Sequence, residues 1–425
     1  MGDALLEELD WRDQIAQVTD RTALEAALAD GPLTLYAGFD PTAESLHVGN
    51  LVPIMLLRRF QLAGHRPLAL VGGATGLIGD PSGRSTERTL ADAGLVADRV
   101  ERIKAQLSGF LTFGDGPADA VMVNNLDWTA GLSAIDFLRD VGKHFSVNQM
   151  LGKESISARL EGGGISFTEF SYMLLQAHDY LALHRRHGCL LQVGGSDQWG
   201  NITAGLDLLR KVDGVGGHAL TAPLITNASG AKFGKSEGGG SVWLDPGLTS
   251  PYAFYQWWLN TDDRDVAGHL RTFTFRSREE TEALVRAVSE RPQAREAQRA
   301  LAEDLTTLVH GPEQLVRAQA ASQALFGRAA LEELDEATLA AALAETSLVT
   351  VGPGPLPPVV ELLAAAGLVE SRSAARRVVQ EGGAYVNNQK VSDIAAVPGE
   401  ADLLHGRFLV LRRGRQKVAG VERRA

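Results

Sequence analysis

The turn between an apolar segment and an amphipathic segment carries side chains suited to binding an anion. The stretch FDPTAESLHVGN (39–50) follows the apolar run 33–37 and precedes a run with helical period at 48–62. Thr42 and His47 supply two side-chain donors, and Gly49 would let a ligand approach the backbone. Because the first turn of a helix exposes N–H groups and favours negative charge, the turn predicts a phosphate site. The alternative is a histidine that only caps or packs against the helix.

A glycine-rich segment, VGGATGLIGDPSGR (71–84), follows a second apolar run. It matches neither the dinucleotide-binding order Gly-x-Gly-x-x-Gly nor the Walker order ending in Gly-Lys-Ser/Thr. An ordinary turn is one interpretation. The other is functional, because Asp80, Arg84 and Arg88 place a carboxylate and two cations at the end of a strand.

The segment FTEFSYMLLQAHDY (167–180) has a polar stripe within a helical pattern. Tyr172, Gln176 and Asp179 stand at i, i+4 and i+7, so they share one helix face. Such a stripe often faces water. A phenol, a carboxamide and a carboxylate on one face are also suited to binding a small polar ligand.

Two further segments contain candidate ligand-binding groups. In LQVGGSDQWGN (191–201), Gln192, Asp197 and Gln198 could hold a ribose or a carboxylate. In KFGKS (232–236), two lysines lie between glycine-rich flanks. Lysines on such a loop are usually only solvated, but a mobile loop is also where cations that close over a ligand would be placed.

The periodicity between residues 33 and 225 predicts an α/β domain. Continuous apolar runs, typical of buried parallel strands, occur at 33–39, 66–73, 119–125 and 188–195. Helical patterns occur around 48–62, 97–111, 167–183 and 197–210. This alternation predicts a Rossmann-like, doubly wound parallel sheet, in which ligands bind at the carboxyl ends of the strands.

The remainder of the chain has a different pattern. Helical segments rich in Ala, Leu, Glu and Arg fill 251–343, and helix breakers at 351–358 indicate a linker or sharp turn. Two more helical patterns follow, at 359–368 and 371–382. The strand-like AYVNNQKV (384–391) then predicts a tight hairpin at its two asparagines.

Composition and charge restrict the class of protein. No run reaches the ~18 apolar residues of a membrane helix, and the acidic N-terminus does not resemble a signal peptide. The single cysteine, Cys189, excludes an internal disulfide, fits a reducing cytoplasm and makes a thiolate metal site an unfavoured interpretation. The net charge of −11 argues against a general nucleic-acid coat. Residues 371–425, however, carry 11 Lys and Arg against 5 Asp and Glu, a net charge of +6. This tail is either a polyanion-binding module or a basic solvated surface.

Taken in this order, the segments resemble the class I aminoacyl-tRNA synthetases, and most closely the bacterial tyrosyl-tRNA synthetase family. The resemblance covers nearly the whole chain and is carried by YAGFDPTAESLHVG, LVGGATGLIGDPSG, VGKHFSVN, ISFTEFSYMLLQ and GGSDQWGNITAG. HVGN is a form of the class signature His-Ile-Gly-His, and KFGKS is a form of Lys-Met-Ser-Lys-Ser. The tail resembles an S4-type RNA-binding domain. Asn50 and the pair Phe233-Gly234 depart from the two signatures.

The resemblance implies a two-step reaction. The tyrosine carboxylate attacks the α-phosphate of ATP, which gives tyrosyl-adenylate and pyrophosphate, and tyrosine then passes to the 3′ end of tRNA(Tyr). A carboxylate with a pKa below about 4 is already ionised at neutral pH, so no general base is needed. Positioning and stabilisation of phosphate charge would carry the first step.

The resemblance also assigns roles to individual residues. Phosphate charge would be stabilised by Thr42, His47, Arg84, Arg88, Lys232, Lys235 and Ser236. Tyrosine would be bound by Tyr36, Asp80, Tyr172, Gln176, Asp179 and Gln198, with Tyr36 and Asp179 on the phenol and Asp80, Tyr172 and Gln176 on the α-amino group. ATP would contact Gly38, Asp40, His47, Gly49, Asn50, Asp197 and Lys235, with Gly49 against the adenine and Asn50 and Asp197 at the ribose. Arg372, Arg376 and Arg377 would contact the tRNA backbone. Mg²⁺ would accompany ATP without a dedicated protein site.

The implied organisation has five parts. They are a Rossmann-like catalytic domain with the ATP and tyrosine site (1–230), a mobile KFGKS loop and connection (231–250), a helical domain on the anticodon side of tRNA (251–345), a linker (346–357) and a small α+β S4-like RNA-binding domain (358–425). A cytoplasmic homodimer with no membrane association is expected.

Three alternatives differ in what they would leave unexplained. A tryptophanyl-tRNA synthetase shares the fold and signatures, but Tyr36 and Asp179 as phenol-binding groups argue against it. An RNA-binding protein with an inactive body would not need the intact set of His47, Lys232, Lys235, Asp80 and Gln198. Another nucleotidyltransferase with the same His-x-Gly turn would have no use for the RNA-binding tail.

Overall fold

The computed structural model describes residues 2–82, 90–161, 164–226, 233–234, 240–327, 329–414 and 417–424. The chain forms two compact units. The first consists of residues 1–245 and 262–297, and the second of residues 246–261 and 298–425. Within the described residues, no helix is both long enough and apolar enough to span a membrane.

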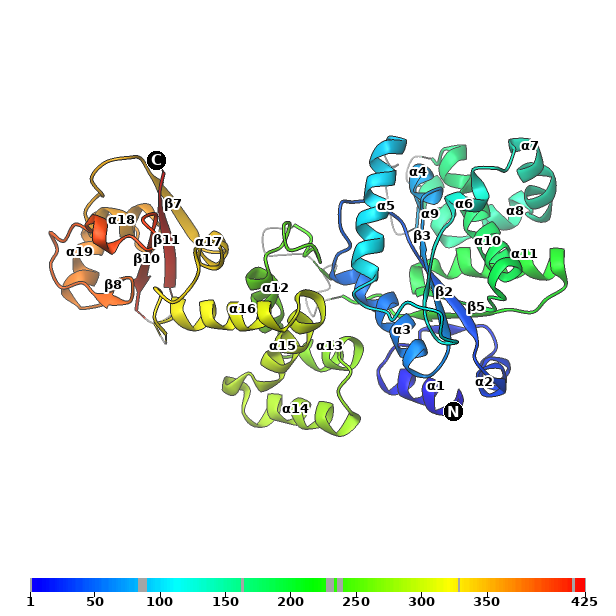
Figure 1. The fold of residues 1–425 in the computed structure, drawn as a ribbon, viewed down its shortest axis with the longest axis horizontal. Helices are drawn as coiled ribbons and strands as arrows, with labels where there is room; N and C mark the ends of the chain where they lie inside the picture. Colours follow the sequence, from blue (N-terminus) through cyan, green and yellow to red (C-terminus); the bar gives the residue numbers. More distant parts are fainter. Residues whose placement is uncertain are drawn as a thin grey trace. The chain divides into compact units, whose positions relative to one another are not determined.

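The first unit is built on a six-stranded sheet in the order β1-β6-β5-β2-β3-β4 (Figure 1). The strands are β1 (Gln17–Val18), β2 (Thr34–Phe39), β3 (Arg66–Val71), β4 (Val121–Asn124), β5 (Leu191–Gly195) and β6 (His218–Ala222). All pairs are parallel except β1 with β6. From β2 the chain proceeds outward through β3 and β4, and then returns to add β5 on the other side of β2. The predicted fold class is therefore confirmed, with a switch point between β2 and β5 where such folds bind ligands.

Helices cover both faces of this sheet. The longer ones are α1 (Gly2–Trp11), α2 (Arg21–Asp30), α3 (Leu51–Leu62), α5 (Ala93–Leu107), α10 (Phe167–His187), α11 (Trp199–Asp213), α13 (Val266–Phe273) and α14 (Arg278–Glu290). Shorter turns are η1 (Val48–Asn50), α4 (Thr75–Ile78), α6 (Leu126–Thr129), α7 (Ala134–Asp136), η2 (Phe137–Val141), η3 (Gly142–His144), α8 (Val147–Leu151), α9 (Glu154–Glu161), η4 (Ser196–Gln198) and η5 (Pro292–Ala294). Buried side chains of α10 and α11 share a core with Tyr36 of β2 and Leu68 and Leu70 of β3.

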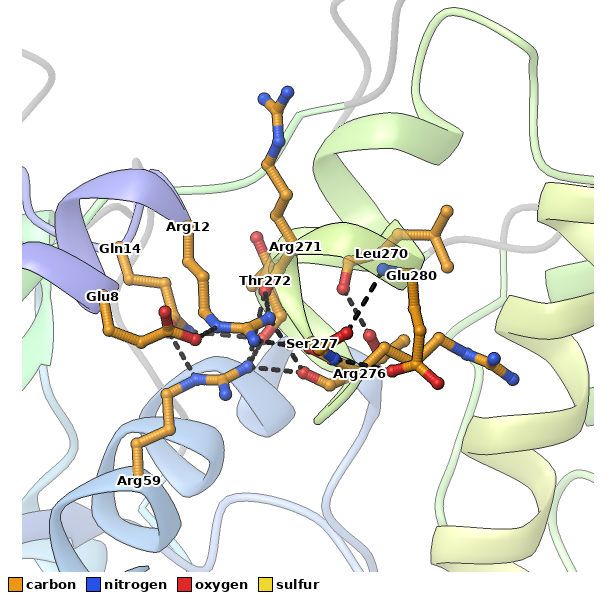
Figure 2. A network of polar contacts seen from close by, with 11 residues as sticks. Glu8, Arg12, Gln14, Arg59, Leu270, Arg271, Thr272, Arg276, Ser277 and Glu280 are labelled. Carbon is orange, nitrogen blue, oxygen red and sulfur yellow. Dashed lines mark hydrogen bonds and ion pairs between the residues drawn. The ribbon is translucent and has the colours of Figure 1, made fainter. Parts of the chain in front are cut away.

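Residues 262–297 belong to the first unit, although the sequence placed them in the helical domain 251–345. Two buried arginines account for this (Figure 2). Arg12, after α1, and Arg59, on α3, donate to main-chain carbonyl oxygens of residues 271–276 at 2.8 to 3.4 Å. The last carbonyls of a helix have no partner within it, and the guanidinium groups supply one at the end of α13. Burial, with repulsion from Arg12, lowers the pKa of Arg59 to about 9.

The second unit combines helices with a five-stranded sheet in the order β7-β11-β10-β8-β9. Its helices are α12 (Pro251–Leu259), α15 (Glu296–His310), α16 (Pro312–Leu325), α17 (Glu336–Ala344), α18 (Val359–Ala365), α19 (Arg372–Gln380) and the turn η6 (Glu400–Asp402). Its strands are β7 (Ser347–Val351), β8 (Ala384–Val386), β9 (Gln389–Lys390), β10 (Phe408–Arg413) and β11 (Lys417–Arg423). The predicted hairpin is confirmed, because β8 and β9 pair around Asn387 and Asn388, which have φ of 44° and 65°.

Two features of this unit differ from the expected division into a helical domain, a linker at 346–357 and a separate C-terminal domain. Residues 347–351 form β7, which pairs in parallel with β11. Phe408 and Val410 of β10 also share a buried core with Leu325 of α16 and Leu339 of α17. The sheet and the preceding helices are therefore packed into one unit, because apolar residues on both sides are buried against each other.

Candidate active site

A cavity of about 430 Å³ is lined by residues at the carboxyl ends of β2 and β5. All thirteen described residues that the sequence assigned to tyrosine, ATP or phosphate line it. They are Tyr36, Gly38, Asp40, Thr42, His47, Gly49, Asn50, Asp80, Tyr172, Gln176, Asp179, Asp197 and Gln198. The other five, Arg84, Arg88, Lys232, Lys235 and Ser236, lie outside the described residues.

The His47 turn holds its imidazole in one orientation. Nδ1 of His47 accepts a hydrogen bond from the Gly49 N–H at 3.0 Å, and Oδ1 of Asn50 accepts one from the His47 N–H at 3.0 Å. Because Nδ1 is an acceptor, the neutral ring carries its hydrogen on Nε2. His47 is therefore both the cap of η1 and a potential donor to a ligand, which combines the two interpretations of the sequence.

Gly49 leaves room for the imidazole of His47. A Cβ atom at position 49 would lie 2.8 Å from Cε1 and 3.0 Å from Nδ1 of His47. A side chain there would displace the imidazole. Gly234, from the KFGKS segment, is similarly close, because its Cβ would lie 2.9 Å from Cγ2 of Val48.

The segment after KFGKS pairs with the His47 turn. The Val48 N–H donates to Val242 O at 3.0 Å, and the Leu244 N–H donates to Leu46 O at 2.9 Å. Within KFGKS itself, the Phe233 ring stacks on the ring of Phe273 of α13, with the ring centroids 5.5 Å apart. The described parts of the two class signatures are therefore in contact, although they are more than 180 residues apart in the chain.

Asp179 is a buried carboxylate held by two donors. On α10 it is 2% exposed, and it accepts hydrogen bonds from Asn125 Nδ2 at 3.0 Å and Trp128 Nε1 at 2.8 Å. Burial raises the pKa of Asp179 to about 7, although both donors lower it and Asp40 raises it further. The helix face is set by the Ser166 cap, which accepts from the Glu169 N–H at 3.3 Å.

Tyr36 places a buried polar atom beside the cavity. Its side chain is 1% exposed, and among the described residues its hydroxyl has no hydrogen-bond partner. Burial, with the charge of Asp179, raises the pKa of Tyr36 well above its ordinary value, so the phenol keeps its hydrogen. A buried polar atom without a partner costs about 1–3 kcal/mol, and a polar ligand would remove that cost.

Asp40 links the tyrosine-side and nucleotide-side candidates. Its carboxylate accepts from Tyr172 OH and from Thr75 Oγ1, both at 2.7 Å. Thr75 Oγ1 in turn accepts from Asn125 Nδ2 at 2.9 Å. The glycine-rich segment makes room for this network, since a Cβ at Gly72 would lie 2.0 Å from Asp40 Oδ1. The segment therefore packs closely against Asp40, and its functional interpretation stays a prediction.

Comparison with known proteins identifies the family. Residues 28–327 match the model for tRNA synthetases class I (W and Y), and residues 344–420 match the model for the tyrosine–tRNA ligase SYY-like C-terminal domain. The tyrosine–tRNA ligase of Nocardia farcinica is 60% identical over 427 residues, which cover 100% of this chain and 99% of the relative. The chain belongs to the tyrosyl-tRNA synthetases of class I.

Other comparisons agree with this membership. The tyrosine–tRNA ligase of Streptomyces coelicolor is 62% identical over 420 residues, 98% of each chain. The solved C-terminally truncated mitochondrial tyrosyl-tRNA synthetase of Aspergillus nidulans is 29% identical with a TM-score of 0.69, over 75% of this chain and 93% of that chain. The class I model covers tryptophan and tyrosine enzymes alike, so the C-terminal model and the full-length relatives decide for tyrosine. The chain is a tyrosine–tRNA ligase that uses ATP, tyrosine and tRNA.

Several residues around the cavity were missed by the assignment of roles from sequence. Asn125 and Trp128 hold Asp179, and Thr75 holds Asp40. Gln192, which the sequence analysis named as a candidate but to which the resemblance assigned no role, lines the cavity with a buried Oε1 that has no partner among the described residues. Asn201 donates to Gln176 Oε1 at 3.1 Å, and its place three residues after Gln198, at the start of the following helix α11, was the available signal.

The proposed tRNA contacts lie in the second unit. Arg372, Arg376 and Arg377 are exposed on α19, and Arg372 forms an ion pair with Glu361 at 3.2 Å.

Across the described part of the chain, no group of three or more His, Cys, Asp or Glu side chains could hold a metal ion.

Proposed function

We propose that the cavity binds tyrosine and ATP side by side and accelerates adenylate formation by donating hydrogen bonds to the departing pyrophosphate. The observation that supports this most directly is that all thirteen described candidates line one cavity at the switch point of the sheet. The reaction needs a positioned carboxylate nucleophile and stabilised phosphate charge rather than a proton-abstracting side chain.

The phenol of tyrosine would lie between Tyr36 and Asp179. Both groups are buried. An amino acid without the hydroxyl would leave the Tyr36 hydroxyl without a partner and remove one donor to Asp179, which costs binding energy. At the other end of the ligand, the ammonium group would be bound by Asp80, Tyr172 and Gln176. Gln198 would bind near the carboxylate.

ATP would occupy the side of the cavity nearer the His47 turn. Thr42 and His47 would donate to the phosphates, Gly38, Asp40 and Gly49 would line the nucleotide, and Asn50 and Asp197 would bind the ribose. Mg²⁺ would neutralise phosphate charge, bound mainly by phosphate and water oxygens. The roles predicted for Arg84, Arg88, Lys232, Lys235 and Ser236 stay predictions.

A crystal soaked with tyrosine tests the arrangement. The ligand phenol should lie within hydrogen-bonding distance of Tyr36 OH and Asp179, with its ammonium group near Asp80 and Tyr172. A phenol bound at the His47 end would contradict the proposal, whatever the activity of the enzyme.

Tyrosine affinity should increase as the pH rises through about 7. The pKa of Asp179 is raised to about 7, and below that pH the protonated group is a weaker acceptor for the phenol than the carboxylate is. KM for tyrosine in ATP–pyrophosphate exchange should therefore be about fivefold lower at pH 8 than at pH 6. Phenylalanine, which lacks the hydroxyl, is the control: its inhibition constant should not follow this profile. A parallel change for both amino acids would assign the titration to another group.

We propose that α19 contacts the tRNA backbone through its exposed arginines. The double substitution Arg376→Ala/Arg377→Ala should raise KM for tRNA in aminoacylation about tenfold at about 0.15 M salt, and should leave pyrophosphate exchange unchanged. The affinity of this double variant for tRNA should also depend less steeply on salt concentration, because two contacts to phosphate groups are lost. Arg210→Ala on α11, 70% exposed, is the matched control. Equal losses in exchange and charging would contradict a tRNA role.

We further propose a homodimer in the cytoplasm. Ile135, Leu138, Val147 and Phe167 are 53 to 74% exposed within a short stretch of the first unit, and exposed apolar surface of this kind favours a partner. Light scattering should give twice the mass of the chain, and a monomer at micromolar concentration would contradict this. The cytoplasmic location follows from tRNA charging for translation, and cell fractionation tests it.

A further inference from the structure

A buried asparagine lies between two of the carboxamides proposed to bind tyrosine. Asn201 on α11 is 4% exposed and is not one of the residues lining the cavity. Its Nδ2 donates to Gln176 Oε1 at 3.1 Å and to Gln198 Oε1 at 3.4 Å. It also lies 3.5 Å from Ser82 Oγ. Its hydrogen-bonding capacity is therefore directed at other site residues rather than at a ligand.

These contacts determine the orientation of each carboxamide, that is, which partner its oxygen faces and which partner its nitrogen faces. The Gln198 Nε2 donates to Asp80 Oδ2 at 2.7 Å, while its oxygen faces Asn201. In Gln176 the oxygen also faces Asn201. Because a carboxamide exchanges donor and acceptor when it turns by half a rotation, a donor at Asn201 favours one orientation of both groups.

We propose that Asn201 is a positioning residue for the amino-acid end of the substrate. An α-amino acid presents only donors at its ammonium group and only acceptors at its carboxylate, so the groups that bind it must stand in fixed orientations. Asn201 donates to the oxygens of Gln176 and Gln198 and thereby fixes the rotation of both carboxamides. The Gln176 oxygen keeps a second lone pair, with which it would accept from the ammonium group. This inference rests on the proposed roles of Gln176 and Gln198 in binding tyrosine.

The test is Asn201→Ala in the full-length enzyme, measured by ATP–pyrophosphate exchange. KM for tyrosine should rise about tenfold, whereas kcat should change less than about threefold and KM for ATP less than about twofold. Asn201→Ser keeps a donor and should recover part of the loss. Thr203→Val is the matched control, because its hydroxyl donates to Trp199 O at 2.8 Å on the same helix and the residue does not line the cavity.

Two further measurements separate positioning from general loss of structure. Inhibition by 4-ethylphenol, which has the phenol but neither charged group, should be the same in Asn201→Ala and in the unaltered enzyme. In a Gln176→Ala background, Asn201→Ala should raise KM clearly less than it does alone, because one of its two targets is gone.

The outcomes are distinguishable. If Gln176→Ala raises KM and Asn201→Ala does not, the positioning role is wrong and the proposed binding site stands. A fall in kcat and thermal stability with KM unchanged would also overturn it, in favour of a purely structural residue. If Gln176→Ala itself leaves KM unchanged, the proposed role of Gln176 fails, and this inference fails with it.

Discussion

Replacing His47 by alanine should slow tyrosyl-adenylate formation by about 100-fold or more while leaving the dissociation constant for tyrosine within about twofold. Nδ1 of His47 accepts a hydrogen bond from the Gly49 N–H, so the imidazole can donate a hydrogen bond from Nε2. A donor to the leaving pyrophosphate becomes important only as negative charge moves onto it, and so acts on the rate rather than on tyrosine binding. Single-turnover adenylate formation and equilibrium dialysis measure the two quantities separately.

Gly49→Ala supplies an independent check on the same atom. The added Cβ would lie 2.8 Å from Cε1 of His47, so it should displace the ring and reproduce much of the loss. In a His47→Ala background the same substitution should cost little, because no imidazole remains to be displaced. Fully additive losses would show that Gly49 acts through something other than His47. A loss of tyrosine affinity equal to the loss in rate would contradict the leaving-group role.

Asp179→Asn should lower kcat/KM for tyrosine by about 100-fold and reduce the preference for tyrosine over phenylalanine. The carboxylate already accepts from Asn125 Nδ2 at 3.0 Å and from Trp128 Nε1 at 2.8 Å, and would also accept from the phenol. A carboxamide has one oxygen and one NH₂ group, so it cannot accept in all three directions. Loss of a hydrogen bond to a charged group costs about 1.5–3 kcal/mol, and the unpaired donors add to this.

Tyr36→Phe is the matched variant on the opposite side of the phenol. It removes a neutral hydroxyl that lacks a partner among the described residues, so it should not lower the thermal stability of the enzyme without ligand. Its effect on kcat/KM for tyrosine should be about tenfold or less, as expected for a neutral hydrogen bond. Exchange rates with tyrosine and phenylalanine, measured for both variants, give the selectivity directly. An unchanged ratio in Asp179→Asn would remove that residue from phenol recognition.

Much of the local structure was predictable because it depends on neighbours in the chain. Continuous apolar runs predicted β2 to β5, and helical period predicted α3, α5, α10 and α11 to within a few residues of their bounds. The Asn387-Asn388 hairpin was predictable because asparagine tolerates positive φ. The candidate site residues could be found because they follow predicted strands or share one helix face. Parallel strands bring their carboxyl ends to one edge, so the cavity could be anticipated before any distance was known.

Other features depended on contacts between distant parts of the chain. β7 is largely exposed, so its sequence lacks the apolar run that identifies a buried strand. The strand with which it pairs, β11, lies about 70 residues later in the chain. The assignment of residues 262–297 to the first unit depends on guanidinium groups from Arg12 and Arg59 that reach carbonyl oxygens, which every residue type carries. Asn125, Trp128 and Asn201 gained their importance only from the groups they contact. Thirteen of the residues that line the cavity could therefore be named beforehand, because they follow predicted strands, share one helix face or belong to the segments that resemble the family. How their side chains are held, and which of them carry a charge, follows instead from the folded arrangement, because hydrogen bonding and desolvation depend on residues brought together from across the chain.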